Sequence, residues 1–291
     1  MPSSNGRPKN KRMSKNQHTL KASYSFEGKG LHTGTYSHMV VLPAAPDTGI
    51  RFRRTDLPGA PEIRALAENV TKTTRSTTIA YGEAEAVTIE HIMSVLTGLG
   101  VDNALIELDN LEVPILDGSA RLYAEAFLKD GLQEQDAPRR YLDIPEAVEL
   151  QDNRSGSWVR IEPADRPSAH ITVDFNSPVL GVQNVDWDED TDYARAIAPC
   201  RTFCFYREIE PMLQGGLIKG GDLSNALVVT DDGYMGDPVL HFPDECGRHK
   251  MLDLLGDFRL SGGFLNARIT AYKPGHSINT QAAKALRALL K

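Results

Sequence analysis

Alternating and helical patterns of apolar residues divide the first part of the chain into short strands followed by two helices. Strand-like runs, several of them rich in β-branched residues, cover residues 37–42, 49–53, 70–80 and 103–108. Residues 88–100 predict an apolar helix with Thr88 as its N-cap and a glycine at its end. A second helix is predicted over residues 120–130.

The second part of the chain repeats this order of strands and helices. Strands are predicted over residues 158–162, 170–175, 223–230 and 264–271. The acidic segment 186–192 predicts a loop, and residues 280–291 predict a terminal helix. Mixed strands and helices in this order favour an α+β fold.

Polar segments mark the expected divisions of the chain. Residues 1–17 are basic and polar, so we expect a disordered extension there. Residues 131–145 crowd Gln, Glu, Asp, Pro and Arg together and predict a boundary between two halves of similar length. We therefore expect an N-terminal α+β domain over residues 18–135 and a C-terminal α+β domain over residues 140–291.

One segment, residues 248–258, combines charged and apolar side chains in a way that indicates function. If it is helical, at about 100° per residue, its polar side chains share one arc and apolar side chains fill the rest of the circumference. These polar side chains are His249, Lys250, Asp253 and Asp257. Such a helix is expected to be buried, and buried charges have to be paired or bind a metal. His249 and Asp253, four residues apart, can point at one ion.

The alternative is a surface hydrogen bond, since His-x-x-x-Asp is frequent in helices. The metal interpretation needs further ligands, and His91 would complete a set of two histidines and one aspartate. Its neighbour Glu90 is a candidate general base, or an acidic residue that complements a helix N-terminus. His276 follows a Pro-Gly turn and is either an imidazolium oriented by Asp257 or an exposed turn histidine.

The composition restricts the class of protein. With 291 residues, of which 41% are hydrophobic and 24% charged, the chain can form a packed core. It has no membrane-spanning run and no secretory signal, so we expect a cytoplasmic protein. The three cysteines lack Cys-x-x-Cys spacing and fit a reducing compartment, although Cys246 leaves a Cys/His metal site open. A net charge of -7 argues against a nucleic acid partner.

Other catalytic motifs are missing from the sequence. It contains no G-x-S-x-G elbow, no His-Glu-x-x-His pair and no Walker loop. The glycines of residues 28–34 are spaced one residue too far apart for dinucleotide binding. What remains is the set that a metal-dependent hydrolase needs: three ligands, an open position for water and a base.

A series of motifs then identifies a family. In order along the chain they are GKGLHTG (28–34), TIEH (88–91), GVDN (100–103), PILDGSA (114–120), DFNSP (174–178), RTF (201–203), KGGDLSNA (219–226), HKMLD (249–253) and GH (275–276). From about residue 17 onward the chain resembles the zinc-dependent deacetylases of lipid A biosynthesis, which act on UDP-3-O-acyl-N-acetylglucosamine.

The resemblance implies two similar domains, each a small β-sheet with paired helices, with the helices packed between the sheets and the active site between the halves. It implies one zinc ion per chain, with iron(II) as the alternative in the cell. The implied metal ligands are His91, His249 and Asp253. Glu90 would activate water, and His276, oriented by Asp257, would be its positively charged partner. Either Glu90 or His276 would protonate the leaving amine.

The resemblance also implies contacts with the substrate. Lys250 and Thr202 would lie next to the reacting carbonyl, and Phe203 would also bind the substrate. Phe175 and Asp174 match positions near the uridine diphosphate, and Lys273 is a candidate diphosphate contact. The region 203–223 would form an apolar passage for the 3-O-acyl chain, unless its apolar side chains are ordinary core. Those side chains are Phe205, Ile209, Met212 and Leu213.

Two segments, residues 178–181 and 200–205, resemble the branch of the family that is fused to a hydroxyacyl-acyl carrier protein dehydratase. Since the chain of 291 residues cannot hold that domain as well, we expect no dehydratase activity. We expect a monomer whose partner is the small-molecule substrate. The sequence does not indicate the length of the acyl chain. Two alternative functions also remain: a non-catalytic protein that binds nucleotide sugars, and an amidase for a different nucleotide sugar.

Overall fold

A five-stranded sheet forms the base of the N-terminal half, residues 15–135, in the computed structural model, which describes residues 15–290. Across the sheet its strands are β2 (Tyr24–Lys29), β3 (Tyr36–Pro43), β9 (Ala104–Leu108), β4 (Ile50–Arg54) and β5 (Glu62–Arg64). Strands β4 and β9 are parallel, and the other neighbours are antiparallel. A smaller sheet contains β6 (Val70–Lys72), β7 (Thr78–Tyr81) and β8 (Ala84–Ala86).

The C-terminal half, residues 140–290, repeats this strand order. Its sheet contains β12 (Val148–Asp152), β13 (Ser157–Pro163), β18 (Phe264–Tyr272), β14 (Ser168–Asp174) and β15 (Val182–Asp188), with β11 (Tyr141–Asp143) paired to β18. Strands β14 and β18 are parallel, as β4 and β9 are, and β12–β13, β13–β18 and β14–β15 are antiparallel. The expected α+β fold of two similar halves is therefore confirmed, although the sequence has no residue-level repeat.

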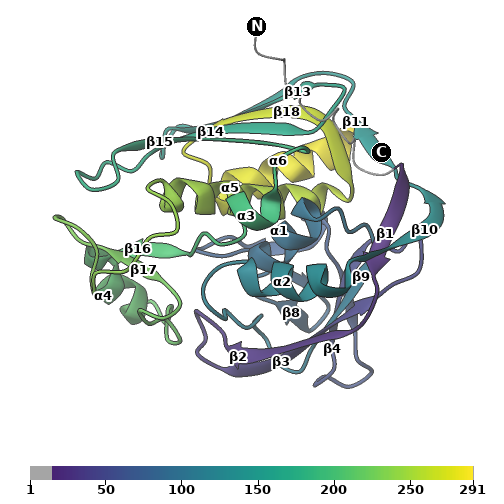
Figure 1. Cartoon of the computed structure of the whole chain (residues 1–291), viewed down its shortest axis with the longest axis horizontal. Helices are drawn as coiled ribbons and strands as arrows, with labels where there is room; N and C mark the ends of the chain where they lie inside the picture. The colour runs from purple at the N-terminus through teal and green to yellow at the C-terminus, as the bar shows by residue number, and fades with distance from the viewer. Residues whose placement is uncertain (1–14, 291) are drawn as a thin grey trace, which may run out of the picture.

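Helices fill the space between the two sheets (Figure 1). They are α1 (Glu90–Gly98) and α2 (Arg121–Asp130) in the first half, and α5 (Glu245–Phe258) and α6 (His276–Leu289) in the second. In chain order α1–β9–α2 corresponds to α5–β18–α6. The equivalent helices α1 and α5 pack against each other, so the two halves meet along them.

A glycine allows this helix pair to approach closely. A Cβ atom added to Gly256 in α5 would lie 2.1 Å from the backbone oxygen of Glu90 in α1. Only the absence of a side chain lets the two backbones touch at this point. The contact brings the first turn of α1 next to the last turn of α5.

The remaining elements are short. They are β1 (Asn16–Leu20), η1 (Ala67–Asn69), β10 (Leu132–Pro138), α3 (Tyr193–Ala196), β16 (Phe203–Phe205), α4 (Tyr206–Gln214), β17 (Leu227–Val229) and η2 (Arg259–Ser261). Residues 203–229, which contain β16, α4 and β17, form an insert beside the layered core (Figure 1). Within residues 15–290 no helix has both the length and the apolar character to cross a bilayer.

Two polar segments form strands where the sequence predicts none. The expected boundary, residues 131–145, contains β10, which pairs with β1, and β11, which pairs with β18. The predicted acidic loop, residues 186–192, is wrong for its first part, because β15 continues to Asp188. Val185 and Trp187 alternate with exposed aspartates and are buried, so the period of two outweighs the charge.

Three predicted segment ends also differ. Thr88 is not an N-cap: it has a φ of 59°, its hydroxyl donates to Glu112, and α1 begins at Glu90. The terminal helix begins at His276, so this histidine opens a helix instead of lying on the turn before it. The predicted extension, residues 1–17, lies outside the described residues except for 15–17, and residues 16 and 17 already belong to β1.

Candidate active site

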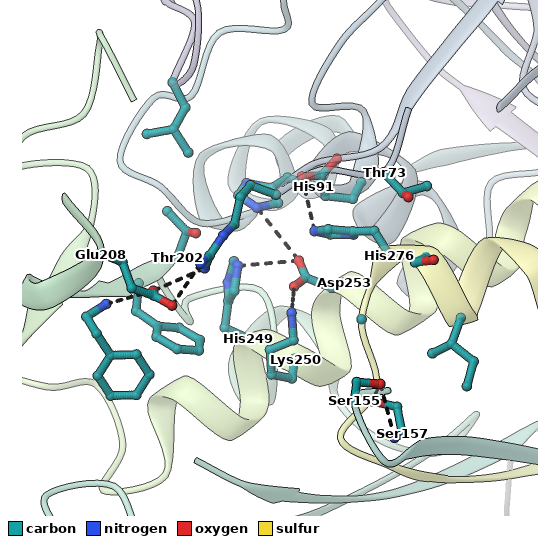
Figure 2. Close-up of a pocket in the computed structure, with 18 of the residues that line it drawn as sticks. Thr73, His91, Ser155, Ser157, Thr202, Glu208, His249, Lys250, Asp253 and His276 are labelled. Carbon is teal, nitrogen blue, oxygen red and sulfur yellow. Dashed lines mark hydrogen bonds and ion pairs between the residues drawn. The ribbon is translucent and has the colours of Figure 1, made fainter. Parts of the chain in front are cut away.

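Helices α1 and α5 bring together the three side chains predicted as metal ligands. His91 comes from the first turn of α1, and His249 and Asp253 face it from α5 (Figure 2). Asp253 Oδ1 lies 3.4 Å from His249 Nε2 and 4.0 Å from His91 Nε2. Tetrahedral zinc, with bonds of about 2.0–2.1 Å, separates neighbouring ligand atoms by about 3.3–3.5 Å. The cluster therefore has nearly the spacing of a metal site.

The hydrogen bonds around the cluster leave one atom of each side chain free for an ion. The ring of His249 contacts the carbonyl oxygen of Cys200 through Nδ1 at 3.0 Å, which directs Nε2 into the cluster. Lys250 Nζ donates to Asp253 Oδ2 at 2.6 Å. Asp253 Oδ1 is buried without a hydrogen-bond partner. A buried oxygen of this kind, beside two imidazole nitrogens, fits a divalent cation.

The charge states also suit metal binding. Burial lowers the pKa of His91 to about 3 and lowers that of His249 as well, so both rings are neutral at neutral pH. Burial raises the pKa of Asp253, but Lys250 and the nearby histidines outweigh it and hold that pKa well below its usual range. Two neutral imidazoles and one ionised carboxylate are the forms that bind a metal.

Glu90 opens helix α1 immediately before His91, and its carboxylate is buried. Its Oε2 accepts the backbone N–H of Thr77 at 3.0 Å, and its Oε1 lies 3.9 Å from His276 Nε2. Burial, helped by Asp253 and opposed by His276, raises the pKa of Glu90 to about 7. A carboxylate with such a pKa can take up and release a proton near neutral pH.

His276, the first residue of α6, has an acidic environment. Its Nδ1 lies 3.0 Å from Asp257 Oδ2, as expected for an imidazolium oriented by that carboxylate. Burial alone would lower the pKa of His276, but Asp257, Glu90 and Asp253 outweigh it and raise this pKa to about 9. His276 is therefore a cation at neutral pH, close to the carboxylate of Glu90.

Two residues that hold this arrangement were missed by the sequence analysis. Thr77 donates its hydroxyl to Asp257 Oδ1 at 2.6 Å, and Asn279 donates its side-chain amide to Asp257 Oδ2 at 3.0 Å. Neither belongs to a recognisable motif, and Thr77 lies in a run that signals only strand.

A cavity of about 380 Å³ opens over these groups (Figure 2). Of the predicted site residues, the following line it: Glu90, His91, Thr202, Phe203, His249, Lys250, Asp253 and His276. A second, mainly apolar cavity of about 250 Å³ adjoins it and is lined by the insert, including Ile209, Met212 and Leu213. The two cavities share part of their walls, namely Leu31, Arg75, Thr202 and Phe203.

The remaining predicted contacts lie beside the cavities. Phe175, Asp174 and Lys273 line neither of them. The ring of Phe175 packs edge-on against Phe203 with centroids 5.5 Å apart, and Lys273 Nζ lies 3.5 Å from Asp174 Oδ2. Phe205 lines the larger cavity, not the apolar one. Among the residues that the structure describes, the group that could hold a metal ion contains His91, His249 and Asp253 and not Cys246, so the Cys/His alternative is not supported.

Comparisons with known proteins agree with this geometry. Residues 17–288 match the family described as LpxC, UDP-3-O-acyl N-acetylglycosamine deacetylase. Among curated proteins, the UDP-3-O-acyl-N-acetylglucosamine deacetylase of Myxococcus xanthus is 42% identical over 265 residues, covering 91% of this chain and 84% of that protein. The protein of the same name from Trichormus variabilis is 40% identical over 279 residues, covering 94% of this chain and 99% of its own length.

Other relatives are longer. The bifunctional enzyme LpxC/FabZ of Porphyromonas gingivalis is 40% identical over 299 residues, which cover 94% of this chain and 65% of that enzyme. The chain thus spans somewhat less than two thirds of the length of the bifunctional relatives that it matches.

Proposed function

Because this chain belongs to the family of UDP-3-O-acyl N-acetylglycosamine deacetylases, we propose that it hydrolyses the N-acetyl group of UDP-3-O-(3-hydroxyacyl)-N-acetylglucosamine in lipid A biosynthesis. The products are acetate and the free 2-amine. One observation carries the proposal. The His-His-Asp cluster and the Glu90–His276 pair share one cavity, and an apolar cavity adjoins it.

We infer that His91, His249 and Asp253 hold one zinc ion, with iron(II) as the alternative. Two imidazoles and a carboxylate suit either metal, and three protein ligands leave a position open, as in catalytic zinc sites. When bound, such an ion polarises a carbonyl oxygen and acidifies water. The unpartnered Oδ1 of Asp253 supports this assignment.

The residues of the chain have distinct tasks in the proposed reaction. Glu90 accepts a proton from water as the water oxygen forms a bond with the acetyl carbonyl carbon. The hydroxyl of Thr202 donates to the carbonyl oxygen as it gains negative charge, and the ammonium of Lys250 adds positive charge nearby. The C–N bond then breaks, and the leaving amine takes a proton from Glu90 or from His276.

The substrate would extend in two directions from this centre. We assign the 3-O-acyl chain to the apolar cavity, where Ile209, Met212 and Leu213 offer apolar walls. We assign the uridine diphosphate to the side of Phe175 and Asp174, with the ammonium of Lys273 facing the diphosphate. The packing of Phe175 on Phe203 supports this, because it connects that side to the cavity wall.

We also propose that the protein acts in the cytoplasm as a monomer. Its three cysteines are free, which fits a reducing compartment. All the groups that the mechanism uses come from one chain, so a second copy is not needed to complete the site. Sedimentation velocity of the purified protein should show a single species of about 32.0 kDa.

The proposal is tested by acetate release from UDP-3-O-(3-hydroxyacyl)-N-acetylglucosamine by purified protein, before and after chelation and after restoring zinc or iron(II). We expect activity to disappear with the metal and to return with it. Glu90→Ala should keep its metal and lose roughly 10²–10⁴-fold in rate, as expected for removal of a general base. Asp253→Ala should lose the metal itself.

Each assignment has its own contrary result. Comparable turnover by Glu90→Ala would remove Glu90 as the base. Full activity after the metal is removed would overturn the metal site. Bound metal without acetate release would instead favour a protein that binds nucleotide sugars, or an amidase for another substrate.

A further inference from the structure

The wall shared by the two cavities contains a charged side chain that the proposed mechanism does not use. Of the four shared residues, only Arg75 carries a full charge, and it comes from the loop between β6 and β7 in the N-terminal half. Arg75 has a φ of 64°, a backbone conformation that is uncommon for a residue with a side chain.

The main contact is an ion pair with the insert. Arg75 donates from both terminal nitrogens of its guanidinium to Glu208, with distances of 2.8 Å and 3.1 Å to the two carboxylate oxygens. Glu208 lies in the first turn of α4, and its carboxylate also accepts the backbone N–H of Phe205 at 3.4 Å. Figure 2 shows Glu208 beside Thr202, at the end of the cavity away from Ser155 and Ser157.

The ion pair is one attachment of the insert to the N-terminal half. At a second, the backbone N–H groups of Lys219 and Gly220 donate to the carbonyl oxygens of His32 and Leu31. The stretch between these attachments supplies four apolar residues to the wall of the second cavity: Ile209, Met212, Leu213 and Ile218. Attachment at both ends holds this wall against the half of the molecule that carries Glu90 and His91.

The two attachments differ in strength. At Gly220 a backbone hydrogen bond to Leu31 is combined with close packing, because a Cβ on Gly220 would lie 2.2 Å from the backbone oxygen of Gly30. Arg75 and Glu208, in contrast, have side chains that are 45% and 29% exposed, so water screens their attraction. The ion pair is the attachment that can open.

We propose that the Arg75–Glu208 ion pair makes the protein favour substrates with a longer 3-O-acyl chain. It holds the apolar cavity in line with the metal cluster, so that an acyl chain bound in one cavity keeps the acetamide in place in the other. The inference rests on the proposed function. Without the ion pair, α4 moves away more easily, and the contacts of a long chain contribute less to binding the reacting substrate.

The test compares two substrates that differ only in the length of the 3-O-acyl chain. For Arg75→Gln and Glu208→Gln we expect the ratio of kcat/KM for the long chain to that for the short chain to fall about two- to fivefold, the range for a partly exposed ion pair. The fall should come mainly from KM for the long chain. The double variant should lose no more than either single variant, and the exchanged pair Arg75→Glu/Glu208→Arg should recover part of the ratio.

A matched control is available in the same half of the chain. Lys72 and Glu85 form an exposed ion pair at 3.3 Å and line neither cavity. Lys72→Gln should leave the ratio unchanged. Equal losses for both substrates, additive losses in the double variant, or an unchanged ratio in Arg75→Gln would each overturn the proposal.

Hydrogen exchange gives a readout that needs no turnover. The backbone amides of residues 206–214 should exchange faster in Arg75→Gln than in the unsubstituted protein. Their exchange rates should be unchanged in Lys72→Gln. If these rates do not change, the ion pair does not hold α4 and the proposal fails. If the unsubstituted protein releases no acetate, the proposed function fails instead, so the two failures are distinguishable.

Discussion

Thr77 contacts Glu90 and also Asp257, the carboxylate that orients His276. Its backbone N–H donates to Glu90 and its hydroxyl donates to Asp257, which holds His276. One small neutral residue therefore fixes the carboxylate and the imidazolium relative to each other. The sequence cannot reveal this role, because it depends on a contact with a residue 180 positions away.

The pH dependence follows from the same groups. The proposed reaction needs the imidazolium of His276, whose pKa is raised to about 9, so kcat/KM should fall as the pH rises through about 9. It also needs ionised Glu90, whose pKa is raised to about 7 with the His276 imidazolium beside it, and a bound metal ion would lower this pKa, so the acid limb should lie at or below 7. A bell-shaped profile of acetate release checks both limbs.

His276→Gln provides the control for the alkaline limb. Its residual activity should no longer decline near pH 9, because the titrating group has been removed. If the decline persists in this variant, a different group is responsible for it.

Residue types and spacing predicted the three side chains of the metal cluster, but not the residues that surround them. The spacing of His249 and Asp253 on a helix indicated one ion, and the structure brings them to His91. His91 itself was identified by its residue type and its motif, not by any pattern that predicts contact. The catalytic and substrate-binding roles of these residues stay predictions until the variants are measured.

At the scale of elements, sequence motifs that lie far apart along the chain pack so closely that a glycine is required at the contact. A Cβ on Gly118 would lie 1.8 Å from the backbone oxygen of Asn225, and the backbone N–H of Thr202 donates to Gly118 at 2.7 Å. The motifs at 114–120, 201–203 and 219–226 therefore pack together at the cavity wall. Their order along the chain identifies a family, but their mutual contacts follow only from the tertiary structure.

The contact of α1 with α5 predicts the effect of a single methyl group. Gly256→Ala should raise the helix propensity of α5 but force its backbone away from Glu90, and overpacking typically costs about 1–3 kcal/mol. We expect a net loss of stability in chemical denaturation and a lower kcat, because Glu90 and His91 move with α1.

Gly233→Ala is the comparison for this variant. A Cβ at Gly233 would have no atom within 4 Å, so stability and turnover should change little. If Gly256→Ala behaves like Gly233→Ala, α1 and α5 can accommodate a methyl group between them, and their close contact does not position the site.

Local patterns predicted helices and strands better than their ends. The candidate helix at residues 248–258 is part of α5, but α5 begins at Glu245, whose carboxylate pairs with Arg201. The aspartates of β15 led to the prediction of a loop. Their sequence neighbours Val185 and Trp187 are buried in a core that exists only once the sheet has folded. Position 276 was assigned to a turn, since Pro-Gly precedes it, yet it opens α6.

At the scale of the whole molecule, a buried cluster joins the two halves away from the site. Asp102, just after α1, accepts hydrogen bonds from Arg139 of the connecting segment at 3.0 Å and 2.7 Å. Arg259 of the second half donates to the carbonyl oxygen of Val101 at 3.0 Å. The guanidinium groups of Arg139 and Arg259 both lie against the ring of Phe264. The polar boundary in the sequence is thus a structural joint.

Asp102→Asn should destabilise the protein strongly. The substitution leaves the buried guanidinium of Arg139 without its carboxylate, and breaking a buried ion pair costs about 3–5 kcal/mol. Denaturant unfolding measures the loss. Glu149→Gln removes one partner of the exposed Arg160–Glu149 pair and should change stability by less than about 0.5 kcal/mol. A loss for Asp102→Asn as small as this would show that the joint is not needed.

Both halves repeat the same order of strands and helices, and this repetition affects how such a protein can evolve. The connection from β5 to α1 in the first half and the connection from β15 to α5 in the second occupy equivalent positions, and they carry Arg75 and Glu208. The paired helices carry Glu90, His91, His249 and Asp253 instead. Apart from Thr77 and Thr202, which also lie in these connections, residues of the connections can therefore change and alter which molecule is retained while the side chains on the helices stay in place, so selectivity and chemistry can evolve separately.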